Sequence, residues 1–256
     1  MQSIKQRLQH GETLLGTWLN LGNPLTAEII GQAGYDWVII DLEHGSGSEQ
    51  DAIAQMQALS ASFTAAFVRV EIAARQRVHR VLDFGAQGIM FPHINDADAA
   101  REARKMMMYP PEGNRGVAKM IRAAGYGRTF DDYLAHQTPE LLGIMQIETQ
   151  RALDQVEAVA AVDGVDVLFI GPADLSMDMG IFGQLKHPRF VEALQKTVAA
   201  AERHHKAVGI LVSDPEQLPF FRDLGLRFLA CGSDGNFLVQ ASSQNLVAMR
   251  KHLGMS

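Results

Sequence analysis

The amino-acid sequence predicts an α/β fold, a single (β/α)8 barrel in which residues 1–256 form one TIM-barrel domain. Three observations support this prediction. Apolar runs of strand length alternate with helical segments eight times along the chain. The length of 256 residues is close to the ~250 residues typical of such barrels. No linker or change of composition divides the chain. A doubly wound open sheet is the competing fold, but it rarely needs eight regular units, and the chain has no G-x-G-x-x-G fingerprint.

Each predicted strand is an apolar run that ends at a polar or turn-forming residue. The sixth, VLFI, is β-branched or aromatic at three of four positions and is stopped by Gly171-Pro172. Continuous apolar runs of this kind suit parallel strands that are covered on both faces. The predicted strands are residues 14–21, 37–44, 63–71, 88–94, 142–149, 167–170, 207–214 and 227–234.

The predicted helices lie between these strands, and a short helix precedes the first strand. The clearest begins with Asn23 as N-cap and Pro24 at the first helical position, and Gly34 follows its end. The helix at 96–106 and the strand at 142–149 are separated by a long insertion, residues 107–138, that shows no regular pattern. Insertions of that length are usually functional loops. The predicted helices are residues 24–33, 49–60, 76–84, 96–106, 151–161, 188–205, 215–224 and 235–253.

Composition limits the partners and the compartment. Apolar residues make up 47% of the chain and charged residues 20%, as in ordinary globular proteins. The net charge of −6, with no basic cluster, argues against a nucleic-acid partner. The single cysteine cannot form an intramolecular disulfide. No apolar stretch reaches the ~18 residues that a membrane span needs, and the N-terminus has no apolar targeting segment. We therefore expect a cytoplasmic protein without a membrane partner.

Carboxylates follow two neighbouring predicted strands. Gln146 and Glu148 end the fifth strand on one face, since side chains two residues apart in a strand point the same way. Asp174 follows the Gly171-Pro172 stop of the sixth strand. Two adjacent carboxylates with a nearby amide and no cysteine cluster make an oxygen-rich site that suits Mg²⁺ or Mn²⁺. The alternative is that Asp174 only caps the following helix.

Three further polar residues lie at the same predicted edge, where barrel enzymes take their catalytic groups. Asp41 and His44 come from the second strand and Arg69 from the third. Each has a structural alternative: His44 as a hydrogen-bonded structural histidine, and Arg69 as a surface-reaching side chain or a partner of Glu71. The convergence of six polar residues on one edge favours a catalytic site.

Five motifs together resemble those of the HpcH/HpaI aldolase family, whose members include 4-hydroxy-2-oxoheptanedioate aldolase and the 2-keto-3-deoxy sugar-acid aldolases. The resemblance is collinear over nearly the whole chain. The motifs are IDLEHG at residues 40–45, VRV around Arg69, YPPEGNRGV at 109–117, QIET at 146–149 and GPADLS at 171–176.

This resemblance implies a class II pyruvate aldolase on a TIM barrel. Such an enzyme uses a divalent metal (Mg²⁺, Mn²⁺ or Co²⁺) to cleave a 4-hydroxy-2-oxo acid reversibly to pyruvate and an aldehyde. The family is typically a homohexamer in which the last helix is exchanged between subunits. A Schiff-base mechanism is disfavoured, because the only lysine near the edge, Lys119, lies in the long loop.

The resemblance also implies roles for individual residues. The base is His44, and Arg69 stabilises the developing enolate. Asp83 would raise the basicity of His44, but it ends a helix at the opposite face and could reach His44 only from a neighbouring subunit. Asp41 is the alternative partner of His44 within the chain. The remaining assignments are Glu148 and Asp174 to the metal, and Gln146, the Ala173 backbone and Asp174 to the substrate.

Two other functions stay open. A CoA-ester carbon–carbon lyase of the citrate-lyase β or malyl-CoA type has a related fold and metal site. Its phosphate groove would have to come from Arg115, Lys119, Arg122 and Arg128, and the chain lacks the extra length usual for such enzymes. A barrel that only binds an acidic metabolite is the non-enzymatic alternative. Departures from the family at residues 45–48 and 119–128 leave the aldehyde unidentified.

Overall fold

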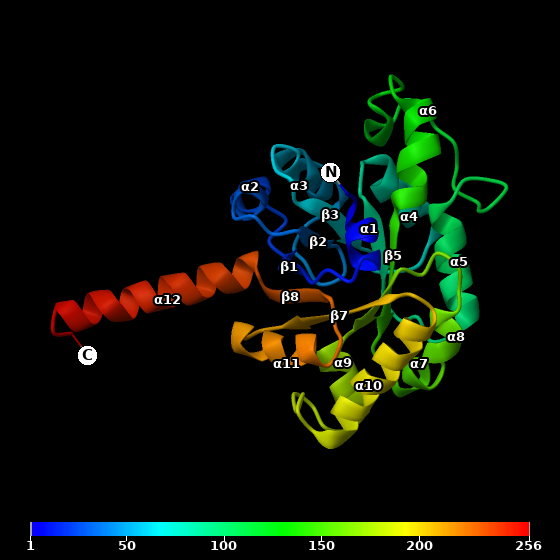
Figure 1. Cartoon of the computed structure of the whole chain (residues 1–256). Coiled ribbons are helices and arrows are strands. Elements are labelled where there is room, and N and C mark those ends of the chain that lie inside the picture. Colours follow the sequence, from blue (N-terminus) through cyan, green and yellow to red (C-terminus); the bar gives the residue numbers. More distant parts are fainter. Residues whose placement is uncertain (1, 256) are drawn as a thin grey trace.

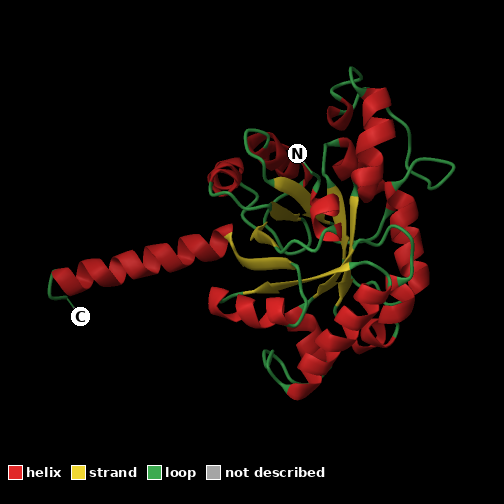
Figure 2. Cartoon of the chain, in the orientation of Figure 1, coloured by secondary structure: helices red, strands yellow, loops and turns green. Residues whose placement is uncertain are grey.

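The computed structural model, which describes residues 2–255, has eight parallel strands that close into a barrel in chain order (Figure 2). The first and last strands pair directly, from Leu14 opposite Phe228 to Trp18 opposite Ser233. The predicted barrel is confirmed. The strands are β1 (Leu14–Leu19), β2 (Trp37–Asp41), β3 (Ala65–Arg69), β4 (Gly88–Phe91), β5 (Leu142–Ile147), β6 (Val167–Ile170), β7 (Ala207–Val212) and β8 (Phe228–Ser233).

Helices connect successive strands and cover the outside of the barrel, apart from α12 and from α1, which precedes β1 and packs Ile4 and Leu8 against the interior cluster of the barrel (Figure 1). The α-helices are α1 (Ile4–Gln9), α2 (Pro24–Gln32), α3 (Glu49–Leu59), α4 (Arg75–Asp83), α5 (Ala97–Met107), α6 (Phe130–Asp132), α7 (Gln150–Asp154), α8 (Val156–Ala160), α9 (Pro172–Asp178), α10 (Pro188–Arg203), α11 (Leu218–Asp223) and α12 (Asp234–His252). Short helices of other types are the 3-10 helices η1 (Arg122–Ala124), η3 (Thr138–Glu140) and η4 (Pro215–Gln217) and the π-helix η2 (Tyr133–Gln137).

Several predicted boundaries are wrong for local reasons. The second strand ends at Asp41 and not at residue 44, because the Asp41 carboxylate accepts the backbone N–H groups of Glu43 and His44 and turns the chain. The predicted helix 151–161 is two helices, α7 and α8, that meet at Gln155. Helix α9 was not predicted, although Pro172 stands at its first position, where proline is favoured.

The barrel interior is filled by aromatic and aliphatic side chains. Trp37 stacks on Phe228 with ring centroids 3.7 Å apart, and Trp18 packs against Phe169 at 5.4 Å. These four rings belong to one buried cluster that also takes in strand residues such as Ile39. Barrels of this kind are packed cores and not pores, so the chemistry is confined to the strand ends.

The sequence suggested that the insertion at residues 107–138 has no regular structure, but the structure shows that it is folded. It contains η1, α6 and η2 and has its own small apolar cluster around Tyr109, Phe130 and Tyr133. Arg115 lies inside this segment with 1% of its surface exposed. The segment is therefore a folded extension of the barrel.

Helix α12 leaves the barrel instead of packing on it, and it projects from the end of β8 as an arm (Figure 1). Only Asp234 of its 19 residues is buried. A helix of that length is about 28 Å long. Its exposed side chains include Val239, Leu246 and Val247. Neither α12 nor another helix within residues 2–255 has the length and apolarity needed to cross a membrane.

Candidate active site

The predicted polar residues at the carboxyl ends of the strands do gather at one edge. Asp41 and Arg69 are the last residues of β2 and β3 and lie side by side in the register of those strands. Gln146 is in β5, Glu148 directly follows that strand, and Asp174 lies in the first turn of α9, after β6. This edge is called the rim below.

At the rim, the Arg69 guanidinium is held by two carboxylates. Its Nε and Nη2 donate to the two oxygens of Asp41, at 2.9 and 2.8 Å, and its Nη1 lies 2.9 Å from Glu43 Oε2. Asn20, from the end of β1, donates to the same Asp41 carboxylate at 2.9 Å. The alternative pairing with Glu71 is wrong, because Glu71 pairs with Arg77.

This arrangement changes what Arg69 offers to a substrate. One guanidinium beside two carboxylates carries a combined charge of −1, so it does not act as a free cation. Three of its five N–H groups point at Asp41 and Glu43, which leaves two for a ligand. Its position is also fixed from within the barrel, with its carbon Cζ 5.9 Å from the Trp18 ring centre. Arg69 therefore presents an oriented pair of N–H groups at the rim.

Glu148 is a buried carboxylate at the centre of the rim, with 3% of its surface exposed. Its Oε1 accepts the backbone N–H of His93 at 2.6 Å, and its Oε2 accepts the Gln146 amide at 3.0 Å. Burial raises the pKa of Glu148, and the nearby carboxylates of Asp174 and Glu43 raise it further, against the lowering by His93. A cation at this position would relieve both the burial cost and the repulsion.

The surroundings of Glu148 fit a divalent metal. Gly171 leaves room for it, since a Cβ at that position would lie 3.0 Å from Glu148 Oε2. Gln146 Oε1 is buried and accepts no hydrogen bond from any group in residues 2–255. Within residues 2–255 no three His, Cys, Asp or Glu side chains form a complete metal cage. Two carboxylates with water or substrate completing the shell is the usual arrangement for Mg²⁺.

Asp174 and Ala173 lie in the first turn of α9, on the exposed side of the rim. The alternative role of Asp174 as helix N-cap is wrong, because Gly171 occupies the cap position. The Asp174 carboxylate has no hydrogen bond or ion pair within the described chain. The backbone N–H groups of Ala173 and Asp174 precede the first hydrogen bond of the helix and are free for a ligand.

His44 lies exposed just beyond β2, in the turn that Asp41 organises. Asp41 Oδ1 accepts the backbone N–H of His44 at 3.3 Å, so Asp41 fixes the main chain of His44. The imidazole has no hydrogen-bond partner within residues 2–255. It is therefore accessible to a substrate at the rim.

Asp83 does not lie at the rim with these residues. It is the last residue of α4, at the end of the barrel where the strands begin. Its carboxylate accepts from Arg115 Nη2 at 2.7 Å, and Arg115 is itself stacked at 4.6 Å from the Tyr109 ring centre. Within one chain, Asp83 of α4 therefore contacts the folded insertion. It lies at the opposite end of the barrel from His44.

Two rim residues were missed by the sequence analysis. Glu43 lies inside the motif IDLEHG, but nothing in the sequence distinguishes it from an ordinary solvent-exposed glutamate at the end of a strand. His93 follows β4 with a left-handed backbone (φ 54°), which aims its N–H at Glu148. Nothing about histidine in MFPHIN signals that conformation, which is uncommon for residues other than glycine.

Comparison with known proteins agrees with this geometry. The family model for HpcH/HpaI aldolase/citrate lyase matches residues 14–241. A hydroxypyruvate/pyruvate aldolase from Paraburkholderia phytofirmans is 40% identical over 253 residues, covering 96% of this chain and 97% of that protein. A 4-hydroxy-2-oxo-heptane-1,7-dioate aldolase from Escherichia coli is 35% identical over 240 residues, covering 94% and 92%.

Solved structures give the same result. A crystal structure of an HpcH/HpaI aldolase/citrate lyase family protein from Burkholderia cenocepacia has a TM-score of 0.91 and 38% identity, covering 96% of this chain and 98% of that one. A citrate synthase, SbnG, has a TM-score of 0.86 and 26% identity, covering 98% of each chain. From the matching family model, the full-length relatives and the rim geometry, the chain belongs to the HpcH/HpaI aldolase/citrate lyase family.

Proposed function

We propose that this protein is a class II pyruvate aldolase, which cleaves a 4-hydroxy-2-oxo acid reversibly to pyruvate and an aldehyde. The observation that carries the proposal is the buried Glu148 carboxylate beside Asp174, on a rim that also presents Arg69 and an accessible His44. Full-length relatives named as hydroxypyruvate/pyruvate and 4-hydroxy-2-oxo-heptane-1,7-dioate aldolases support it.

In this proposal Glu148 and Asp174 hold a divalent ion, Mg²⁺, Mn²⁺ or Co²⁺. When bound, the ion supplies Lewis-acid stabilisation to the pyruvate half of the substrate. Gln146 orients the Glu148 carboxylate through a 3.0 Å hydrogen bond, and its buried Oε1 has no partner among residues 2–255. The backbone N–H groups at Ala173 and Asp174 bind the pyruvate carboxylate.

His44 is the proposed base. It accepts the proton of the C4 hydroxyl, directly or through a water. The O–H electron pair then forms the aldehyde C=O, the C3–C4 bond breaks, and its electron pair passes into the enolate of pyruvate. Return of a proton to C3 completes the cleavage. The two free N–H groups of Arg69 stabilise the enolate oxygen as charge develops on it.

Substitution of Arg69 tests this role. Arg69→Ala is expected to lower both aldol cleavage and oxaloacetate decarboxylation by about 10²–10³-fold in turnover, because both reactions pass through the same enolate. It also leaves Asp41 and Glu43 without their partner, at a cost to folding stability of about 3–5 kcal/mol. Turnover is therefore measured below the melting temperature of each variant.

Arg69→Lys is the matched control, because it keeps the charge but loses the two-pronged contact with Asp41. Its losses in both reactions should be smaller than those of Arg69→Ala. A folded Arg69→Ala variant with full decarboxylase turnover would limit Arg69 to holding Asp41 and Glu43.

A CoA-ester lyase is the second candidate, since the family includes citrate lyases. Of the four basic residues considered for CoA phosphates, Arg115 is fully buried against Asp83, and Arg122 donates to two backbone carbonyls. Lys119 and Arg128 have no ion pair within residues 2–255, so an assay has to separate the two functions. We expect carbon–carbon bond formation from pyruvate and a panel of hydroxyaldehydes and semialdehydes, and none from acetyl-CoA with the same panel. The products are measured by mass spectrometry with Mn²⁺ present. Activity with acetyl-CoA alone would replace the aldolase assignment.

We also propose that the protein is a homohexamer in which α12 packs on a neighbouring subunit. Val239 and Leu246 of α12 and its C-cap residue Leu253 are exposed and spaced by seven residues, so they form one apolar stripe along this unsupported helix. Leu25 and Ile29 of α2, each 67% exposed, offer an apolar surface to receive such a helix. In such an assembly Asp83 would act on the His44 of a neighbour, held in place by Arg115.

Leu246→Glu is expected to dissociate the assembly, because it places a charge in the stripe and removes about 1.5–3 kcal/mol of apolar burial per site. Sedimentation velocity measures the change. Gln244→Glu adds the same charge two residues away, on the opposite side of the helix, and should leave the oligomer intact. A wild-type protein that sediments as a monomer would contradict the proposal, as would equal effects of the two variants.

A further inference from the structure

Asp234 is a buried carboxylate at the junction between β8 and α12, with 4% of its surface exposed. Burial of a carboxylate is unfavourable unless hydrogen bonds satisfy its oxygens. Those oxygens accept from the backbone N–H groups of Asn20 at 2.8 Å and Leu21 at 3.4 Å, and from the Thr26 hydroxyl at 2.8 Å. Asp234 therefore holds the loop after β1, residues 20–22, which is called the β1 loop below.

Capping of α12 does not account for this carboxylate. The N-cap of α12 is Ser233, whose hydroxyl accepts the backbone N–H of Asn236 at 3.2 Å. Asp234 accepts one N–H group of the helix itself, that of the adjacent Gly235 at 2.8 Å. Its other hydrogen bonds lie outside α12, so the side chain is directed at the barrel.

The β1 loop in turn holds the segment that carries His44. Asn20 O accepts the backbone N–H of Ser46 at 2.7 Å, and Asn20 Nδ2 donates to Asp41 at 2.9 Å. The Asp41 carboxylate also accepts the His44 N–H. Asn20 is therefore linked to this segment on both sides of His44.

Close packing of two backbones makes the link stiff. A Cβ on Gly45 would lie 3.2 Å from Asn20 O, and a Cβ on Gly22 would lie 2.6 Å from Gly47 Cα. Gly22 has a φ of 64°, which glycine adopts without strain. Because no side chain separates the two segments, a shift of the β1 loop displaces the segment that carries His44.

We propose that Asp234 is a positioning residue for the aldol reaction, which sets the position of His44 through Asn20. The inference rests on the proposed function, in which His44 is the base. Two hydrogen bonds in series carry the effect, from Asp234 to the Asn20 N–H and from Asn20 O to Ser46. Asp234 itself contacts no reacting atom.

Arg69 does not depend on this link. Asp41 and Glu43 hold its guanidinium by three contacts of their own. Loss of Asp234 should therefore impair proton removal by His44 more than stabilisation of the enolate by Arg69. Aldol cleavage needs both steps, whereas oxaloacetate decarboxylation needs the second alone.

Asp234→Ala tests the proposal on the full-length protein. Turnover in aldol cleavage is expected to fall about 10–100-fold, because a small misplacement of a reacting group costs rate on that scale. Oxaloacetate decarboxylation should keep most of its rate. Backbone hydrogen exchange, followed by mass spectrometry, reports on the segment independently of activity. The peptide that covers residues 43–47 should exchange about 10-fold faster, the factor that one hydrogen bond carries.

Asp234→Asn is the conservative variant, because its amide oxygen can still accept the Asn20 N–H. Its NH₂ group can donate to the Thr26 hydroxyl, which can donate to Asn23 O, 3.0 Å away. It should recover most of the cleavage rate and the slow exchange that Asp234→Ala loses. Asp234→Ser, which is too short to reach Asn20 but keeps a polar group at the start of α12, replaces Asp234→Ala if that variant does not fold.

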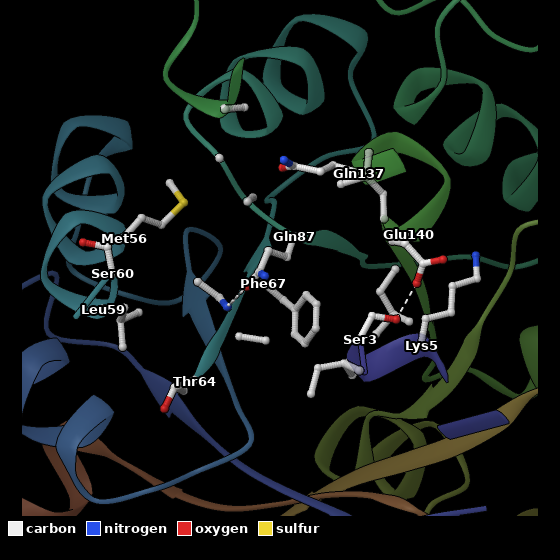
Figure 3. Close-up of a pocket in the computed structure, with 18 of the residues that line it drawn as sticks. Ser3, Lys5, Met56, Leu59, Ser60, Thr64, Phe67, Gln87, Gln137 and Glu140 are labelled. Atoms are coloured by element: carbon white, nitrogen blue, oxygen red, sulfur yellow. Dashed lines mark hydrogen bonds between the residues drawn. The ribbon is translucent and has the colours of Figure 1, made fainter. Parts of the chain in front are cut away.

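Two control variants remove hydrogen bonds without cutting the link. Thr26→Val takes away the contact with the other oxygen of Asp234 and leaves the Asn20 contact in place. Gln87→Ala removes the acceptor of the Ala66 N–H, at 2.9 Å, in the wall of a cavity at the opposite end of the barrel (Figure 3). Both should leave the ratio of cleavage to decarboxylation and the exchange of residues 43–47 as in the wild type.

Either unchanged exchange or an unchanged ratio of the two reactions in Asp234→Ala would overturn the proposal. The same selective loss in Thr26→Val would overturn it as well, because general loosening of the loop would then be the cause. Faster exchange in Asp234→Ala, in a protein that cleaves no 4-hydroxy-2-oxo acid, would uphold the link from Asp234 to His44 and overturn the aldolase assignment alone.

Discussion

Removal of divalent metal with EDTA is expected to abolish aldol cleavage, and Mn²⁺, Co²⁺ or Mg²⁺ should restore it. The physical reason is the position of Glu148, whose burial and carboxylate neighbours raise its pKa and make a cation its natural partner. Without the ion, only hydrogen-bond donors such as the two remaining N–H groups of Arg69 face the charge that forms on the pyruvate half, and Arg69 is itself paired with two carboxylates. Pyruvate formation is followed by coupled reduction to lactate.

Glu148→Gln is the matched variant for this experiment, because it keeps the shape and removes the charge. It should lose metal binding in direct titrations, and added Mn²⁺ should not restore its activity. Survival of activity in EDTA, with trapping of pyruvate on the protein by borohydride, would establish a Schiff base and sink the class II assignment. The insertion that contains Lys119 would then be the place to look for the reactive amine.

Replacement of His44 by alanine is expected to lower aldol cleavage by about 10²–10⁴-fold, the usual scale of general base catalysis. Oxaloacetate decarboxylation should be affected much less, because it generates the enolate without removing a proton from a C4 hydroxyl. The imidazole is exposed and has no partner within residues 2–255, so its removal should not disturb the rim. Both rates are measured on the same preparation.

The contrast with Arg69→Ala makes this experiment decisive, since that variant should impair both reactions. His10→Ala, an exposed histidine at the end of α1, controls for the loss of a surface imidazole. Equal losses in the two reactions, together with a lower melting temperature, would mean that His44 is structural and that another group is the base.

The order of strands was predictable because each one is a compact apolar run, and parallel strands buried on both faces require such runs. Strand ends were less predictable. The apolar residues of this run extend to Leu42, but the Asp41 carboxylate accepts the N–H groups of Glu43 and His44 and ends β2 early. A side chain that competes for backbone hydrogen bonds leaves no trace in a hydrophobic pattern.

Site residues were predictable from the sequence where a polar residue directly follows a buried strand, as Glu148 follows β5. It was not predictable where the backbone makes the contact. The His93 N–H reaches Glu148 because of a left-handed backbone, and Glu43 reaches Arg69 because the chain turns at Asp41. The placement of Asp83 depends on an assembly that a single chain does not contain, and its proposed role stays a prediction.

The aromatic side chains inside the barrel include tryptophans whose intrinsic fluorescence can report on the site. The chain has two tryptophans, and both Trp18 and Trp37 lie in the interior, with at most 3% of their surface exposed. Their emission therefore comes from the barrel and not from the surface or the α12 arm. The Trp18 indole lies under the Arg69 guanidinium, at 5.9 Å, so any ligand that draws the guanidinium away changes the electric field at the indole. Intrinsic fluorescence is thus a label-free signal of events at the rim.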